Sequence, residues 1–309
     1  LNKTIKGQKR KSLLKTIRKK QWRVMQCIVK EFSNGSFATE FQEFLNSLNG
    51  KIPEGIFVFS LTDAQILRED GKEPWQMITG SKDLGLYKFN KHLPLLAYSG
   101  QQGYWDIPIP TQDDIDYVKN PQDIPNIEWS QKIQKAVFRG NPTGCGYTTE
   151  TNMRLKISTL NSPLLDAGII QNKSSSLKFD PIEGLGELNQ AQIKKVPKLD
   201  LINEQIKFKY IVHIDGNVLA YRLLKSMLLG SLILRVRSPY IHWLDHIMEE
   251  GKHFIYVKED LLDLEQRIEW CIQNDTKAKK IAQQGQRFAQ KVLTKDFINK
   301  YFLKLLKSL

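Results

Sequence analysis

The chain has 309 residues, of which 41% are hydrophobic, and this is enough to form one large domain or two medium ones with a sizeable core. No apolar run approaches the ~18–20 residues that span a bilayer, because the longest, residues 227–234, is interrupted by Gly230 and Ser231. The formal net charge of +13 is concentrated near the start, where ten Lys or Arg and no acid lie between Lys3 and Arg23.

This basic run predicts a solvated helix or tail. The functional alternative is a patch for nucleic acid, an anionic membrane or an acidic acceptor. Because the run is nearly without aromatics, we expect no nucleic-acid partner and keep peripheral membrane contact through the basic N-terminus as the alternative. No apolar h-region follows the basic start and no Lys-Asp-Glu-Leu-type signal ends the chain, so we expect a cytoplasmic location.

Residues 1–125 are predicted to contain helices followed by short buried strands. Apolar side chains recur at helical spacing over residues 12–48. Residues 56–60 and 93–98 are mainly apolar runs that are typical of buried strands. Residues 106–111 are expected to be extended, because their two prolines remove N–H donors and forbid helix.

From residue 126 onward the pattern alternates between strands and helices, which is typical of an α/β fold with parallel sheets. The expected strands are 135–138, 208–214, 231–236 and 253–257, and the expected helices begin at 152 and cover 219–229, 240–248, 261–274 and 277–309. Residues 121–125 have the composition of a linker. We therefore predict two Rossmann-like domains facing a central cleft, residues 1–125 and 126–290, with a C-terminal helix at 291–309 that packs back on the first domain.

The strongest motif is the segment 213–217, His-Ile-Asp-Gly-Asn, which ends a buried strand just before a predicted helix. The carboxyl edge of such a sheet, where helix N–H groups point, attracts phosphate. Gly216 lets the backbone approach closely, and Asp215 or Asn217 can cap the helix. Arg222 can reach back to neutralise a pyrophosphate. The alternative is an ordinary strand-turn-helix with a surface arginine.

A second predicted strand ends in a glycine-rich loop over residues 137–144, and Arg154 lies on the helix that follows. Arg139, Gly140 and Asn141 belong to this strand end and are candidate contacts to a nucleotide. The loop lacks the Gly-Lys-Ser/Thr ending of a P-loop and the full Rossmann fingerprint, so a plain connection between strand and helix is the alternative.

A carboxylate just past the expected strand 56–60, Asp63, is well placed to act as a general base. The alternative for a single acid of this kind is a surface loop. Asp70 and Asp106 also lie near predicted strand ends and are competing candidates.

No metal constellation is visible in the sequence. The spacing of Cys27, Cys145 and Cys271 fits no zinc motif. His242 and His246 are four residues apart, but the glutamate of a zinc-protease motif is absent between them. We therefore expect no metal and no other cofactor.

Taken together, these segments resemble glycosyltransferase family 90, the protein O-glucosyltransferase and capsule-associated-protein family. The resemblance spans about residues 95–290, and upstream Phe59 and Asp63 look like the strand-then-aspartate segment of the family. The resembling residues are Trp129 and Lys132, residues 137–140, Lys209, Tyr210, Asp215, Gly216 and Arg222, residues 230–234, residues 253–261, and Asn274, Asp275, Ala282, Gly285, Phe288 and Ala289.

The resemblance implies a GT-B fold and an inverting mechanism without a metal. It implies that the partners are a UDP-sugar co-substrate, with glucose or xylose as the sugar, and a glycan or glycoprotein whose hydroxyl accepts it. It makes Asp63 the catalytic base, in a first domain that lies on the acceptor side. The contacts to the nucleotide diphosphate that it implies are Asn141, Arg154, Gly216, Asn217 and Arg222.

Two alternatives stay open at this point. One is a non-catalytic basic binding module, either a degenerate transferase or a nucleic-acid-binding protein. The other is a phosphate-ester or nucleotide-processing α/β enzyme. The presence of the arginines and of Asp63 argues against degeneration, and the second enzyme class lacks a recognisable nucleophile or metal site.

Overall fold

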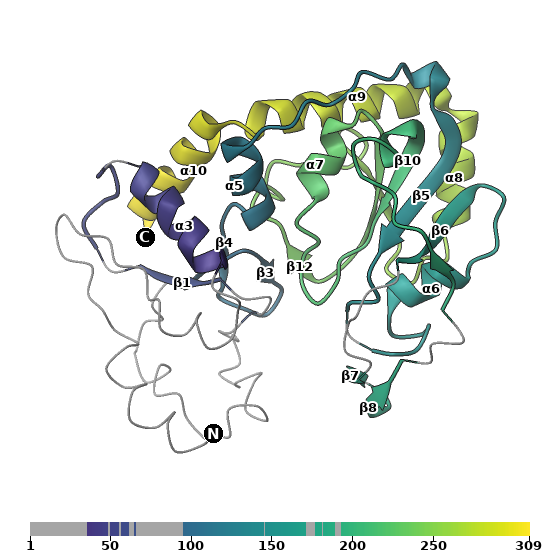
Figure 1. Cartoon of the computed structure of the whole chain (residues 1–309), viewed down its shortest axis with the longest axis horizontal. Helices are drawn as coiled ribbons and strands as arrows, with labels where there is room; N and C mark the ends of the chain where they lie inside the picture. The colour runs from purple at the N-terminus through teal and green to yellow at the C-terminus, as the bar shows by residue number, and fades with distance from the viewer. Residues whose placement is uncertain are drawn as a thin grey trace. The chain divides into compact units, whose positions relative to one another are not determined.

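The computed structural model describes residues 36–48, 50–55, 57–61, 65, 95–144, 146–170, 177–180, 182–188 and 193–309 (Figure 1). The chain divides into two compact units. The N-terminal unit takes residues up to Asp116 together with Ile241–Trp243 and Lys295–Leu309. The C-terminal unit takes Tyr117–Tyr240 and Leu244–Thr294.

A parallel sheet in the order β1-β2-β4 lies in the N-terminal unit. β1 (Val58–Ser60) pairs with β2 (Leu95–Ala97), and β2 pairs with β4 (Ile107–Pro108). Pro108 is tolerated because β4 is an edge strand, where a missing N–H breaks no ladder on the open side. A further short strand, β3 (Gly100–Gln101), pairs with β12 (Tyr240–Ile241), whose residue Ile241 belongs to the same unit.

The helices of this unit come from both ends of the chain. They are α3 (Ser36–Ser47), the start of α5 (Gln112–Lys119) and the C-terminal helix α10 (Lys295–Ser308). Phe302 of α10 is fully buried, and its ring centroid lies 5.2 Å from that of Phe44 and 6.2 Å from those of Phe41 and Phe59. The last helix therefore supplies part of the core of the N-terminal unit.

The sequence predicted a helix over residues 240–248, and this prediction is wrong. The segment forms β12 and then a series of turns. Trp243 is buried in the N-terminal unit, where its indole N–H donates to Asp114 Oδ2 at 2.8 Å and its carbonyl accepts from the Tyr301 hydroxyl at 3.0 Å. These tertiary contacts override the helical spacing of the local apolar residues.

The C-terminal unit is built on a six-stranded sheet in the order β13-β11-β10-β5-β6-β9, and its neighbouring strands are parallel. The strands are β5 (Ile133–Gly140), β6 (Leu165–Ile170), β9 (Lys195–Val196), β10 (Phe208–His213), β11 (Leu232–Val236) and β13 (Ile255–Val257). β10 and β11 are buried at every residue, as the inner strands of a sheet covered on both faces must be.

The helices of this unit are α6 (Met153–Thr159), α7 (Leu223–Leu228), α8 (Leu264–Gln273) and α9 (Asp275–Val292), with short 3-10 turns η2 (Trp129–Gln131) and η4 (Gln205–Lys207). A small antiparallel hairpin is formed by β7 (Leu177–Asp180) and β8 (Gly184–Glu187). α7 begins at Leu223, later than the expected 219, because the residues after β10 form turns.

The predicted α/β class is confirmed, because each of the two units contains a parallel sheet. None of the helices in the described part of the chain is long and apolar enough to cross a membrane.

We predict that Phe302→Ala lowers the free energy of unfolding by about 3–5 kcal/mol, because it leaves a cavity among three phenylalanine rings. Urea unfolding measures the change. The control is Lys304→Ala on the exposed side of the same helix, which should stay within about 0.5 kcal/mol of the wild type. Equal losses in the two variants would show that α10 does not contribute to the core.

Candidate active site

The candidate site lies where the winding of the C-terminal sheet reverses. After β5 the chain adds β6 and β9 on one side, and then returns to add β10 on the other side of β5. In an open parallel sheet, ligands bind outside the carboxyl ends of the strands at such a switch point. The two loops that follow β5 and β10 carry Asn141–Thr143 and Ile214–Asn217, so the two sequence motifs meet there.

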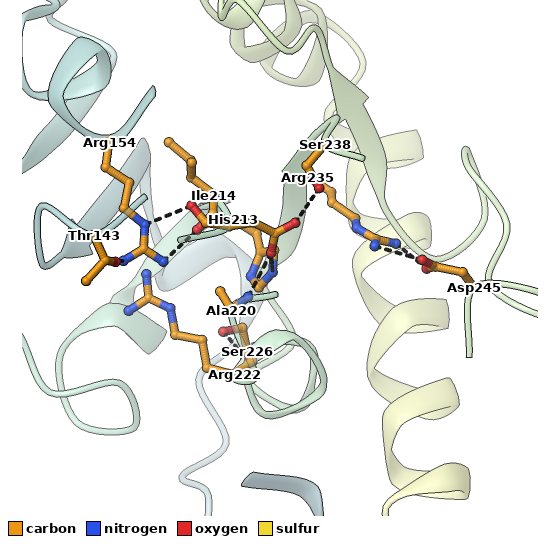
Figure 2. A network of polar contacts seen from close by, with 11 residues as sticks. Thr143, Arg154, His213, Ile214, Ala220, Arg222, Ser226, Arg235, Ser238 and Asp245 are labelled. Carbon is orange, nitrogen blue, oxygen red and sulfur yellow. Dashed lines mark hydrogen bonds and ion pairs between the residues drawn. The ribbon is translucent and has the colours of Figure 1, made fainter. Parts of the chain in front are cut away.

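Arg154 of α6 ties these two loops together (Figure 2). On the β5 side its Nη1 donates to the Asn141 carbonyl at 3.2 Å and to Thr143 Oγ1 at 2.6 Å. On the β10 side its Nη2 donates to the Ile214 carbonyl at 2.9 Å and its Nε to the Asp215 carbonyl at 3.0 Å. The side chain is buried, so the cross-tie fixes the spacing between the loops.

The position of Arg154 follows from the start of its helix. Asn152 is the N-cap of α6, and its side chain accepts from the N–H groups of Arg154 at 3.0 Å and Leu155 at 3.3 Å. Its Nδ2 donates to the Gly146 carbonyl at 3.2 Å. The cap therefore fixes the first turn of α6 against the loop after β5.

A second guanidinium faces Arg154. Figure 2 shows the Arg222 side chain extending toward that of Arg154. Burial and the charge of Arg222 lower the pKa of Arg154 to about 10, so Arg154 stays charged at neutral pH. Arg235 at the end of β11 pairs with Asp245, to which its Nη2 donates at 3.1 Å. Two cations held close together at a strand edge favour an anionic ligand.

Asp215 organises the turn after β10 from within. Its Oδ1 accepts from the Ala220 N–H at 2.8 Å and its Oδ2 from the Ser238 hydroxyl at 2.6 Å. Burial raises its pKa, but His213, 3.5 Å away, and the Ser238 and Ala220 bonds outweigh that effect and lower it to about 2. The carboxylate is therefore ionised and bonded to protein groups, which indicates a positioning role in the turn; its assignment as a nucleotide-binding residue stays a prediction.

Position 216 requires glycine because neighbouring side chains lie close to its Cα. A Cβ at this position would lie 2.7 Å from Thr143 Oγ1 and 3.2 Å from Arg154 Nη2. Asn217 links the loops a second time, because its Oδ1 accepts from the Gly144 N–H at 2.9 Å and its carbonyl from the Tyr240 hydroxyl at 2.7 Å. Neither Asp215 nor Asn217 caps α7, whose N-cap position is occupied by Arg222.

Arg139 and Gly140 have structural contacts at the end of β5. The Arg139 guanidinium pairs with Asp166 at 2.8 Å and donates to the Pro197 carbonyl at 3.2 Å, so it joins β5 to β6 and to the segment after β9. Gly140 leaves room for the ring of Phe138, which a Cβ would approach to 2.8 Å. The structure does not bring Arg139 into the network of Arg154.

Four of the residues through which the chain resembles the family lie at the opposite, amino-terminal edge of the sheet. Lys132 donates to the carbonyls that precede β10 and β11, those of Ile206 at 2.6 Å and Leu229 at 2.9 Å. Burial lowers the pKa of Lys132 to about 8. Asp275 accepts from the Trp129 indole at 3.0 Å and pairs with Lys209 at 2.8 Å. These residues stabilise the sheet away from the candidate site.

The predicted base, Asp63, lies outside the described residues, as does Asp70. Asp106 is described and is buried in the N-terminal unit. Within the described part of the chain, no group of three or more His, Cys, Asp or Glu side chains could hold a metal ion.

Sequence reasoning missed Thr143 and Ser238 as site residues. Thr143 lies within the glycine-rich loop and accepts from Arg154, whereas Ser238 follows β11 and donates to Asp215. A hydroxyl residue in the loop two or three residues after a buried strand is the signal that could have found both.

A parallel sheet with such a switch point is an arrangement in which α/β proteins bind ligands at the carboxyl edge of the sheet. The chain belongs to glycosyl transferase family 90, which it matches over residues 30–309.

Named relatives support the family and differ from the chain in length. Uncharacterized protein 035R of Invertebrate iridescent virus 3 is 33% identical over 266 residues, covering 78% of this chain and 24% of that protein. Human Protein O-glucosyltransferase 3 is 31% identical over 225 residues, covering 69% of this chain and 41% of that protein. The chain thus spans less than half the length of these relatives. Among solved structures, HepE of Anabaena in complex with UDP and glucose has a TM-score of 0.44 at 11% identity, covering 91% of this chain and 83% of that one.

We predict that Gly216→Ala destabilises the protein by about 1–3 kcal/mol, because the new methyl group forces Thr143 and Arg154 apart. Thermal unfolding measures the effect. In a Thr143→Ala background the nearest clashing atom is absent, so the same substitution should cost less there. Strictly additive losses from the two changes would contradict the close approach.

Proposed function

We propose that the protein is an inverting glycosyltransferase that moves a sugar, glucose or xylose, from a UDP-sugar to a hydroxyl of a glycan or glycoprotein. Family membership supports a transferase, and the human relative is named a protein O-glucosyltransferase. The observation that carries the proposal is the pair of guanidiniums, Arg154 and Arg222, at the switch point of the C-terminal sheet.

The two arginines have different roles in this proposal. The guanidinium N–H groups of Arg154 donate to Asn141, Thr143, Ile214 and Asp215. This side chain therefore positions the loops and adds positive charge. Arg222, at the start of α7, makes paired hydrogen bonds to the diphosphate. As the bond from the sugar to the diphosphate breaks, negative charge grows on the leaving oxygen, and cations fixed in advance stabilise it.

Two neighbouring groups complete the proposed donor site. Asn141 Oδ1 is a buried acceptor without a hydrogen-bond partner in the described part of the chain, and leaving it unpaired costs free energy that a ligand N–H or O–H would recover. Gly216 lets Thr143 and Arg154 lie close to the turn, so that the Arg154 charge stands beside the proposed diphosphate position.

The acceptor half of the reaction is assigned to Asp63 on the family resemblance. Its carboxylate takes the proton from the acceptor hydroxyl while the oxygen of that hydroxyl attacks the anomeric carbon from the side opposite the diphosphate. The new glycosidic bond forms as UDP leaves, and the configuration at the anomeric carbon inverts. Because arginines balance the charge of UDP, we propose that the reaction needs no divalent metal.

A cytoplasmic location is also proposed. Its support is the low cysteine content, three in 309 residues, since secreted proteins more often carry paired cysteines. Fractionation of cells that produce the protein tests this point.

We predict that Arg222→Ala weakens UDP binding by about 10- to 150-fold, corresponding to the ~1.5–3 kcal/mol of hydrogen bonds to a charged group. Isothermal titration with UDP measures it, with and without EDTA, and the chelator should change nothing. The matched control is Arg267→Ala on the exposed side of α8, where the arginine pairs with Asp263. If Arg222→Ala binds UDP as the wild type does, Arg222 has no role in the donor site.

We predict that Asp63→Asn lowers turnover at least ~10²-fold and leaves UDP affinity nearly unchanged, because the amide keeps the shape of the side chain but cannot accept the proton. UDP release from UDP-glucose, measured over a panel of hydroxyl acceptors, tests it. Asp106→Asn is the comparison. Normal turnover in Asp63→Asn together with loss in Asp106→Asn would move the base to Asp106.

A further inference from the structure

The outer side of α9 carries a row of cations. Lys277, Lys280, Arg287 and Lys291 are all exposed, and their steps of three, seven and four residues place them along one line of the helix. We name these four residues the α9 basic face. At about 1.5 Å per residue, the row extends for roughly 21 Å. The opposite side of α9 packs on α7 and β11 within the C-terminal unit (Figure 1).

Within the described part of the chain, no acidic side chain pairs with the cations of the α9 basic face. The only acid of α9 is Asp275, which accepts from the Trp129 indole and pairs with Lys209. The four cations form no ion pair with any residue that the structure describes. The other exposed residues of α9 are uncharged and polar, namely Thr276, Gln283 and Gln290.

The arrangement works against the stability of the helix. Lys277 and Lys280 are three residues apart, and Arg287 and Lys291 are four apart, so each pair is a like-charge contact that destabilises a helix. Lys277 also lies in the first turn of α9, where the helix dipole disfavours cations, whereas Lys291 lies in the last turn, where the dipole favours them. A helix that only needs to be solvated mixes both signs, as α8 does with Glu265, Arg267 and Glu269.

We propose that the α9 basic face docks the C-terminal unit on an anionic lipid bilayer. A straight row of cations on one line of a helix can meet a plane along its whole length, and each Lys or Arg near an anionic surface adds to the attraction. Trp270, which is 38% exposed, lies one turn before α9, where its carbonyl accepts from the Asn274 N–H at 2.9 Å. Tryptophan prefers the membrane–water interface.

The observations favour a bilayer over nucleic acid. The exposed residues of α9 include no aromatic side chain on which bases could stack, and single-strand binders depend on such platforms. They also include no apolar side chain, so the contact is electrostatic adsorption without insertion of the helix. This surface is separate from the candidate active site, and the inference does not depend on the proposed function.

The test is co-sedimentation of the full chain with vesicles of phosphatidylcholine alone or with about 30% phosphatidylserine. The α9 variant replaces all four residues of the face by Gln. The control variant replaces four exposed lysines elsewhere in the same unit by Gln, so that both variants lose the same charge; these are Lys135, Lys198, Lys207 and Lys258. Thermal unfolding verifies that both variants fold.

We expect the wild type to bind the anionic vesicles and to be released by added salt. The α9 variant should lose at least about 10-fold in partitioning, and the control less than about 3-fold. Equal losses in the two variants would overturn the proposal, because binding would then reflect net charge alone, including the basic stretch from Lys3 to Arg23. Absence of vesicle binding by the wild type would also overturn it. The proposal would also be overturned if binding of a short DNA duplex depended on the α9 basic face while binding of vesicles did not.

Discussion

The buried guanidinium of Arg154 is the interaction on which the candidate site depends. Its four hydrogen bonds join the loop after β5 to the turn after β10, and these are the two strands between which the winding of the sheet reverses. A buried cation needs fixed acceptors, and backbone carbonyls at strand ends supply them. Because Arg154 satisfies these carbonyls, the loops can lie close together with Gly216 between them.

The same sheet is held at its other edge by a second buried cation. Lys132 donates to carbonyls that precede β10 and β11, and burial lowers its pKa to about 8. At this edge, burial of the Lys132 charge costs free energy, and the charge has a structural role only. At the carboxyl edge the pKa of Arg154 is about 10, and Arg222 adds a second charge beside it. Asp215 shapes the turn through its bonds with Ala220 and Ser238.

The sequence predicted β10 and β11 because buried parallel strands are continuous apolar runs. It missed β6 and β9 of the same sheet, since Asp166 and Gly168 interrupt the apolar run of β6 and β9 has only two residues. It also identified both loops of the site, since glycine and polar residues directly after a strand are local signals. It could not predict that Asp215 serves the turn or that Arg139 pairs with Asp166, because those partners lie far along the chain. The helix expected at residues 240–248 failed for the same reason, since Trp243 is held by Asp114 and Tyr301.

The central claim is that Arg154 and Arg222 form the diphosphate site of a family 90 glycosyltransferase. A crystal structure of the chain soaked with UDP tests it most directly. The account predicts that diphosphate oxygens lie within hydrogen-bond distance of the Arg222 guanidinium, beside Gly216 and above the carboxyl ends of β5 and β10. UDP bound elsewhere on the chain, with the Arg222 side chain making no contact to it, would contradict the account.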